Sequence, residues 1–113
     1  MAKNLKFGVL LDLYGNMISG KQYEAMDLYY NEDMSLAEIG DILGISRQAV
    51  RSSIKKGEEN ILFYEEKLGL YKKSEKLKKK IGNTAAKLEK LNKEIKSDKL
   101  SECIEELSGI ELI

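Results

Sequence analysis

Six polar and basic side chains near the middle of the sequence have the types that recognise nucleic acids. They fall within one short stretch and are Arg47, Gln48, Arg51, Ser52, Lys55 and Lys56. Arg and Gln can form paired hydrogen bonds with the edges of bases, and Lys can meet backbone phosphates. In a helix all six would project away from the apolar positions of the same stretch. The sequence therefore predicts a nucleic-acid-binding helix face here.

A solvated helix face is the alternative interpretation of the same six residues, because runs of charge on helices usually do no more than face water. The distribution of charge also disfavours binding to DNA. Residues 1–46 contain three basic and seven acidic side chains, and this negative excess would repel phosphates. We therefore do not expect tight DNA binding by the chain alone.

The elements that must position these side chains form a helix-turn-helix pattern over residues 35–57. Ser35 begins a capping box before a short helix, Gly44 suits the turn, and Ser46 caps the next helix. Gly40 stands where the two helices must approach closely. We expect five apolar side chains to fill the core that the two helices share: Ile39, Leu43, Ile45, Val50 and Ile54.

Helical periodicity extends on both sides of this motif. It predicts one helix over residues 5–14, a second between Ser19 and Asn31, and continuation of the capped helix to about Gly69. Acidic pairs at Glu58-Glu59 and Glu65-Glu66 stand at helical spacing from lysines, and we expect ion pairs between them. The sequence predicts no β-strand.

Beyond residue 70 the composition becomes rich in Lys. Apolar residues continue there at heptad spacing, namely Leu77, Ile81, Leu88, Leu91 and Ile95. Gly82-Asn83 interrupts this seam, and a break and a continuous helix are both compatible with it. A short amphipathic segment over residues 100–107 follows the apolar seam.

These patterns predict an all-α fold, a helical bundle with a helix-turn-helix and a helical C-terminal tail. We expect a helix-turn-helix domain over residues 1–70 and a Lys-rich helical extension over residues 71–113. The apolar seam of the tail favours a homodimer, and the alternative is that the seam packs on the chain's own long helix.

Composition narrows the function classes. The chain contains no His and a single Cys, Cys103, so the usual nucleophile and base pairs, a disulfide and a cysteine-based zinc site have no residues to form them. We therefore expect no enzymatic activity, no catalytic residue, no metal and no cofactor. The chain also lacks an apolar run long enough to span a bilayer and a recognisable export signal, so we expect a cytoplasmic protein with no membrane span.

The stretch from Tyr29 to Tyr71 resembles the YlxM family of small bacterial proteins. The similarity covers roughly residues 4–72, and its most specific parts are three runs, SLAEI from Ser35, SRQAV from Ser46 and YEEKL from Tyr64. The resemblance implies a helix-turn-helix like that of sigma factor region 4 and a DNA-binding or regulatory role. It also implies an accessory role in co-translational targeting, because genes of the family are associated with those of the signal recognition particle GTPase and its receptor.

Two interpretations stay open from the sequence. In the first, the protein is a regulator that binds DNA or the signal recognition particle RNA through Arg47, Gln48, Arg51 and Lys55. In the second, the helix-turn-helix is a scaffold, and the protein contacts the targeting GTPase or its receptor without binding nucleic acid.

Overall fold

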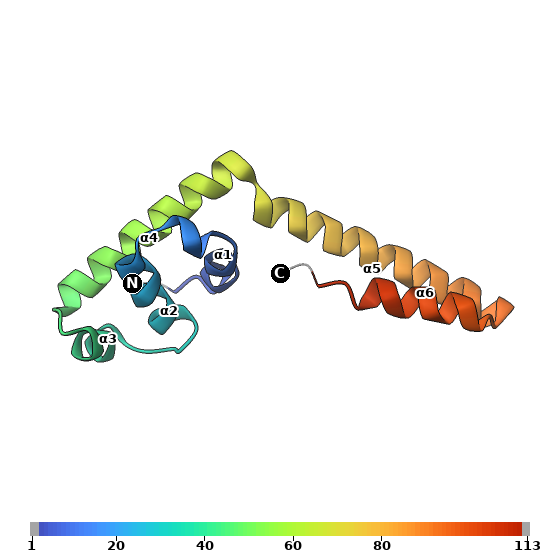
Figure 1. Ribbon diagram of the computed structural model, residues 1–113, viewed down its shortest axis with the longest axis horizontal. Coiled ribbons are helices and arrows are strands. Elements are labelled where there is room, and N and C mark those ends of the chain that lie inside the picture. Colours follow the sequence, from blue (N-terminus) through green and yellow to red (C-terminus); the bar gives the residue numbers. More distant parts are fainter. Residues whose placement is uncertain (1–2, 112–113) are drawn as a thin grey trace. The chain divides into compact units, whose positions relative to one another are not determined.

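The computed structural model of the protein describes residues 3–111, and helices follow one another throughout this part of the chain (Figure 1). The elements are α1 (Lys6–Tyr14), the 3₁₀ turn η1 (Gly15–Met17), α2 (Gly20–Tyr30), α3 (Leu36–Leu43), α4 (Arg47–Leu68), α5 (Leu70–Ile95) and α6 (Asp98–Ser108). No strand occurs between residues 3 and 111, which confirms the all-α fold class. The chain divides into two compact units at the step from Leu70 to Tyr71.

The first unit is built around α4, which packs against α1, α2 and α3. Each helix contributes buried side chains to one core. They are Phe7, Leu10, Leu11 and Tyr14 from α1, Ala25, Met26 and Tyr29 from α2, Ile39 from α3, and Val50, Ile54 and Ile61 from α4. The long helix therefore has one face fixed in the core, and its other faces are left to solvent.

Local capping fixes where the helices of this unit begin and end. Ser19 and Ser35 each form the complete capping box, with Gln22 and Glu38 respectively. The turn between α3 and α4 passes through Gly44 at a φ of 69°, a left-handed conformation that glycine adopts without steric cost. The helix-turn-helix expected over residues 35–57 is thus confirmed.

The prediction that Ile45 fills the core shared by α3 and α4 is wrong. Its side chain is 42% exposed, whereas Ile39, Val50 and Ile54 are fully buried. The close approach at Gly40 explains the difference, since a Cβ built there would lie 2.7 Å from the carbonyl oxygen of Ile45. The turn thus places the backbone of Ile45, rather than its side chain, against α3.

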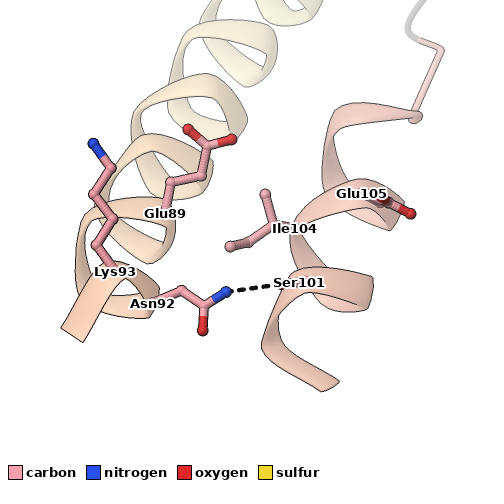
Figure 2. A pocket seen from close by; sticks show the side chains of 6 residues that line it. All are labelled: Glu89, Asn92, Lys93, Ser101, Ile104 and Glu105. Atoms are coloured by element: carbon pink, nitrogen blue, oxygen red, sulfur yellow. Dashed lines mark hydrogen bonds between the residues drawn. The ribbon is translucent and has the colours of Figure 1, made fainter. Parts of the chain in front are cut away.

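The second unit contains the long helix α5 and the shorter helix α6. α5 runs through Gly82 and Asn83 without interruption. α6 turns back and lies alongside the later part of α5 (Figure 1). The two helices are joined by a hydrogen bond of 2.8 Å from Asn92 Nδ2 to Ser101 Oγ, and Ile104 points from α6 toward α5 (Figure 2). Among the described residues of this unit, Ala85 and Ile104 are the ones whose side chains are buried.

None of the helices within residues 3–111 is both long enough and apolar enough to cross a lipid bilayer.

Candidate nucleic-acid interface

The six side chains predicted to recognise nucleic acid all lie exposed in the first half of α4. The start of this helix is fixed by Ser46, whose Oγ accepts a hydrogen bond of 3.1 Å from the backbone N–H of Ala49. Val50 and Ile54 enter the core from the same stretch. Because the apolar side of α4 is anchored in this way, the polar side chains between these residues must face solvent.

A shallow depression of about 380 Å³ brings part of the set together with α3. Its lining comes from Arg47, Gln48 and Arg51 on α4 and from Ser35, Leu36 and Ala37 at the start of α3. The beginnings of two helices therefore border the same surface, and each carries the partial positive charge of its unpaired N–H groups. Residues 35–37 were not among the predicted site residues, although the capping serine already marked the start of α3.

A second depression of about 400 Å³ continues along α4. It is lined by Gln48, Arg51, Ser52 and Lys55, so Gln48 and Arg51 border both hollows. Lys56 lines neither of them, since its position on the helix turns it to another side. The structure therefore groups five of the six predicted residues, and it leaves Lys56 apart.

The charge of this surface is uniformly positive along α4. Arg47 and Arg51 are the two arginines of the whole sequence, and no acidic residue occurs between them and Gly57. Along the chain, the nearest acidic residues are Asp41 of α3 before this stretch and Glu58 of α4 after it, and Glu38 and Asp41 are exposed on α3. Planar guanidinium groups one helical turn apart suit bidentate contacts with bases or phosphates.

Two acidic residues further along α4 have partners that the sequence did not indicate. Tyr30 donates a hydrogen bond to Glu58, and Tyr14 donates one of 2.6 Å to Glu65. The expected ion pair of Glu58 with a lysine is therefore wrong. Burial, and then these hydrogen bonds, raise the pKa of both tyrosines above the usual value. These contacts fix α4 to α1 and α2, and thereby orient its exposed half.

Within the described part of the chain, no three acidic or Cys side chains lie close enough together to hold a metal ion. Cys103 is exposed on α6.

Comparison of the sequence with known protein families shows to which family the chain belongs. The sequence model of UPF0122, described as "Putative helix-turn-helix protein, YlxM / p13 like", matches residues 1–103. The chain belongs to this family. The family match confirms the resemblance and extends well beyond residue 72, so α5 and the first part of α6 belong to the shared pattern.

Several relatives are similar over different lengths. A UPF0122 protein of Clostridium perfringens strain SM101 is 39% identical over 110 residues, which cover 92% of this chain and 98% of the relative. A UPF0122 protein of Thermoanaerobacter sp. strain X514 is 35% identical over 88% of this chain and 86% of its own length. A third, from Caldanaerobacter subterraneus subsp. tengcongensis, is 49% identical over 65% of this chain, and the match spans only 62% of that relative.

Proposed function

We propose that this UPF0122 protein is a regulatory protein that binds nucleic acid through the first half of α4. The observation that carries the proposal is the joint surface of Arg47, Gln48 and Arg51 with the start of α3. Exposed arginines beside two helix N-termini are suited to a negatively charged ligand. The helix-turn-helix supplies the rigid support that such recognition requires.

The six side chains of the surface fall into two groups with different roles in this proposal. Arg47, Gln48 and Arg51 form paired hydrogen bonds with base edges, which a structured RNA presents in unpaired loops and bulges. Ser52, Lys55 and Lys56 contact the sugar-phosphate backbone, which positions the protein without reading the sequence. Lys56 lies outside both depressions, so its contact would be the most peripheral one.

We propose the RNA of the signal recognition particle as the nucleic acid. The family resemblance supplies this pathway, and the charge distribution supports a structured RNA over duplex DNA. Residues 71–99 contain eleven basic and four acidic side chains, whereas residues 1–46 have an acidic excess. A chain with such opposed regions can face phosphates with one part while another part contacts protein.

The test is a titration of the full chain against the particle's RNA, its GTPase and an unrelated DNA duplex at matched salt. We expect the RNA to bind most tightly and its affinity to fall steeply with salt. Arg47→Ala and Arg51→Ala should each cost about 1–3 kcal/mol of binding free energy. Lys21→Ala is the matched control, because it removes one positive charge at an exposed position of α2, away from the first half of α4. Unchanged binding by both arginine variants, with their folding intact, would contradict the proposal.

A second candidate function is protein docking to the targeting GTPase or its receptor. The observation that favours it is the exposure of Leu62 and Phe63, at 52% and 54%, beyond the basic half of α4. Exposed neighbouring apolar side chains mark surfaces that bind proteins. In the same titration, salt-insensitive binding to the GTPase that Phe63→Ser abolishes would favour this candidate. Binding to the DNA duplex alone would favour a transcriptional regulator.

A further inference from the structure

We propose that one side of α5 binds the phosphate backbone of double-helical RNA by charge alone. This inference rests on the proposed function, since it takes RNA as the ligand, and it adds a second contact surface in the other unit of the chain. The contact positions the protein on paired RNA and does not read the sequence of bases.

The side of α5 that faces α6 is fixed by two residues spaced seven apart. Ala85 is buried, and Asn92 Nδ2 donates a hydrogen bond of 2.8 Å to Ser101 Oγ of α6. Residues seven apart lie on nearly the same side of a helix, because successive residues are about 100° apart. The direction through Ala85 and Asn92 therefore defines the inner side of α5, and the opposite direction defines its outer side.

Lysines occupy the outer side of α5. By the same helical spacing, five lysines lie within about 50° of the direction opposite to Ala85 and Asn92. They are Lys76, Lys79, Lys80, Lys87 and Lys90, and we call them the lysine face. Lys72 precedes them on this side, Asn83 lies among them, and Glu94 ends the side one turn after Lys90. The lysine face extends along the helix for about 21 Å.

The positive charge of the lysine face is not neutralised by the described part of the chain. All five side chains are exposed, and none of them forms an ion pair with another residue between positions 3 and 111. Lys78, which lies on the inner side seven residues before Ala85, pairs instead with Glu75 at 3.7 Å. Like charges one helical turn apart repel one another, so a ligand of opposite charge lowers the energy of this side.

Between residues 76 and 90, the outer side of α5 carries no apolar side chain, and this composition selects the class of ligand. Protein interfaces have an apolar centre, and helices that lie on membranes insert apolar side chains into the lipid. A nucleic-acid backbone, in contrast, can be bound by lysines alone, because each neutralised phosphate releases a counterion. The lysine face therefore fits a chain of phosphates.

Paired RNA suits this face better than unpaired RNA. Proteins bind unpaired bases by stacking them on aromatic rings or on Arg, and the lysine face contains neither. The A-form double helix keeps one set of base edges in a deep, narrow groove and is recognised mainly through its shape, its phosphates and its 2′-hydroxyl groups. Lysine is a point charge on a flexible stem, so it can meet such phosphates without a fixed geometry.

The first experiment titrates the full chain with a fully paired RNA duplex of about 20 base pairs, at salt concentrations from about 50 to 200 mM. Fluorescence anisotropy measures the affinity. In the lysine-face variant, Lys76→Gln and Lys87→Gln, affinity at the lowest salt should fall about tenfold. The slope of log affinity against log salt should become shallower by about two, one for each lost phosphate contact.

The control variant carries Lys78→Gln and Lys99→Gln. It removes the same charge from the inner side of α5 and from an exposed position of α6, so it should bind the duplex like the unaltered chain. Circular dichroism should show the same helix content for both variants, because the substituted lysines are exposed.

Three results of this experiment would overturn the inference. One is an unaltered chain that does not bind the RNA duplex even at the lowest salt. Another is an equal affinity of the lysine-face and control variants. The third is tighter binding to a DNA duplex of the same sequence, which would assign the lysine face to DNA.

A second experiment separates this inference from the proposed function. The variant Arg47→Ala, Arg51→Ala is titrated with the same duplex and with the RNA of the signal recognition particle. It should lose affinity mainly for the particle's RNA, since a fully paired duplex offers no unpaired bases to α4. If it does so while the lysine-face variant binds the duplex like the control, the lysine face is wrong and the proposed function stands. If the lysine-face variant alone loses affinity, the lysine face stands and the function proposed for α4 is wrong.

Discussion

Tyr14 joins three parts of the first unit through a single hydroxyl group. Its ring is fully buried, its hydroxyl donates to Glu65 Oε1, and the same oxygen accepts a hydrogen bond of 3.1 Å from the backbone N–H of Leu70. The contact therefore connects α1 with the end of α4 and with Leu70, the last residue of the first unit. Tyr30 forms the corresponding contact from α2 to Glu58. These two tyrosines set the orientation of α4.

The raised pKa of these tyrosines predicts how stability depends on pH. In the unfolded chain Tyr loses its proton near pH 10, whereas in the folded chain both hydroxyls keep theirs to higher pH. The stabilisation is complete below about pH 10, and it is lost as the pH rises through the folded pKa. We expect the free energy of unfolding, measured by urea denaturation, to fall over this range.

Variants that lack the hydroxyls provide the control for this pH dependence. In the double variant Tyr14→Phe, Tyr30→Phe the fall above about pH 10 should be smaller, because neither residue can ionise. At neutral pH each substitution should cost about 1 kcal/mol through the lost hydrogen bond. Tyr23→Phe, at an exposed tyrosine, should behave like the unaltered chain. Identical pH profiles for the double variant and the unaltered chain would show that Tyr14 and Tyr30 do not cause the fall in stability.

At the scale of the elements, the contact between α3 and the turn depends on the absence of a side chain at Gly40. An added Cβ would collide with the carbonyl oxygen of Ile45, which is backbone and cannot move alone. We expect Gly40→Ala to lower the free energy of unfolding by about 1–3 kcal/mol, as overpacking usually does. Thermal unfolding followed by circular dichroism measures the effect.

Two other helical glycines provide matched comparisons. At Gly57 the added carbon would meet the sulfur of Met26, which is the flexible part of a side chain, so Gly57→Ala should cost less than Gly40→Ala. At Gly82 nothing lies within 4 Å, and Ala there should stabilise α5 by about 0.5–1 kcal/mol. An equal loss of stability for all three variants would contradict the role assigned to Gly40.

At the scale of the whole molecule, the two units differ in how much they bury. Every helix from α1 to α4 contributes to one core, whereas Ala85 and Ile104 are the buried side chains among the described residues of the second unit. Opening of a segment is easier where few apolar contacts hold it. We therefore expect amide hydrogens of residues 71–108 to exchange faster than those of α4.

Hydrogen exchange followed by mass spectrometry would measure this difference. Equal protection along the chain at low concentration would contradict the division into units of unequal stability. The same measurement tests the prediction that residues 1–70 and 71–113 are separate domains.

The helices and most of their ends are predictable from the sequence alone. Ser19, Ser35 and Ser46 cap their helices as expected, and Gly44 and Gly69 take left-handed conformations after α3 and α4. These features depend on interactions within about four residues, so their residue types and spacing suffice to predict them. The exposed side of α4 follows in the same way from the period of its apolar residues.

The contacts between these helices, in contrast, could be learned only from the folded chain. It turned Ile45 outward, gave Glu58 and Glu65 tyrosine partners from α2 and α1, and brought Ser35 to the surface of Arg47 and Arg51. It also kept α5 continuous through Gly82 and placed α6 on one side of its apolar seam. Each outcome depends on packing between helices, and local periodicity specifies which face of a helix is apolar but not which distant residue will cover it.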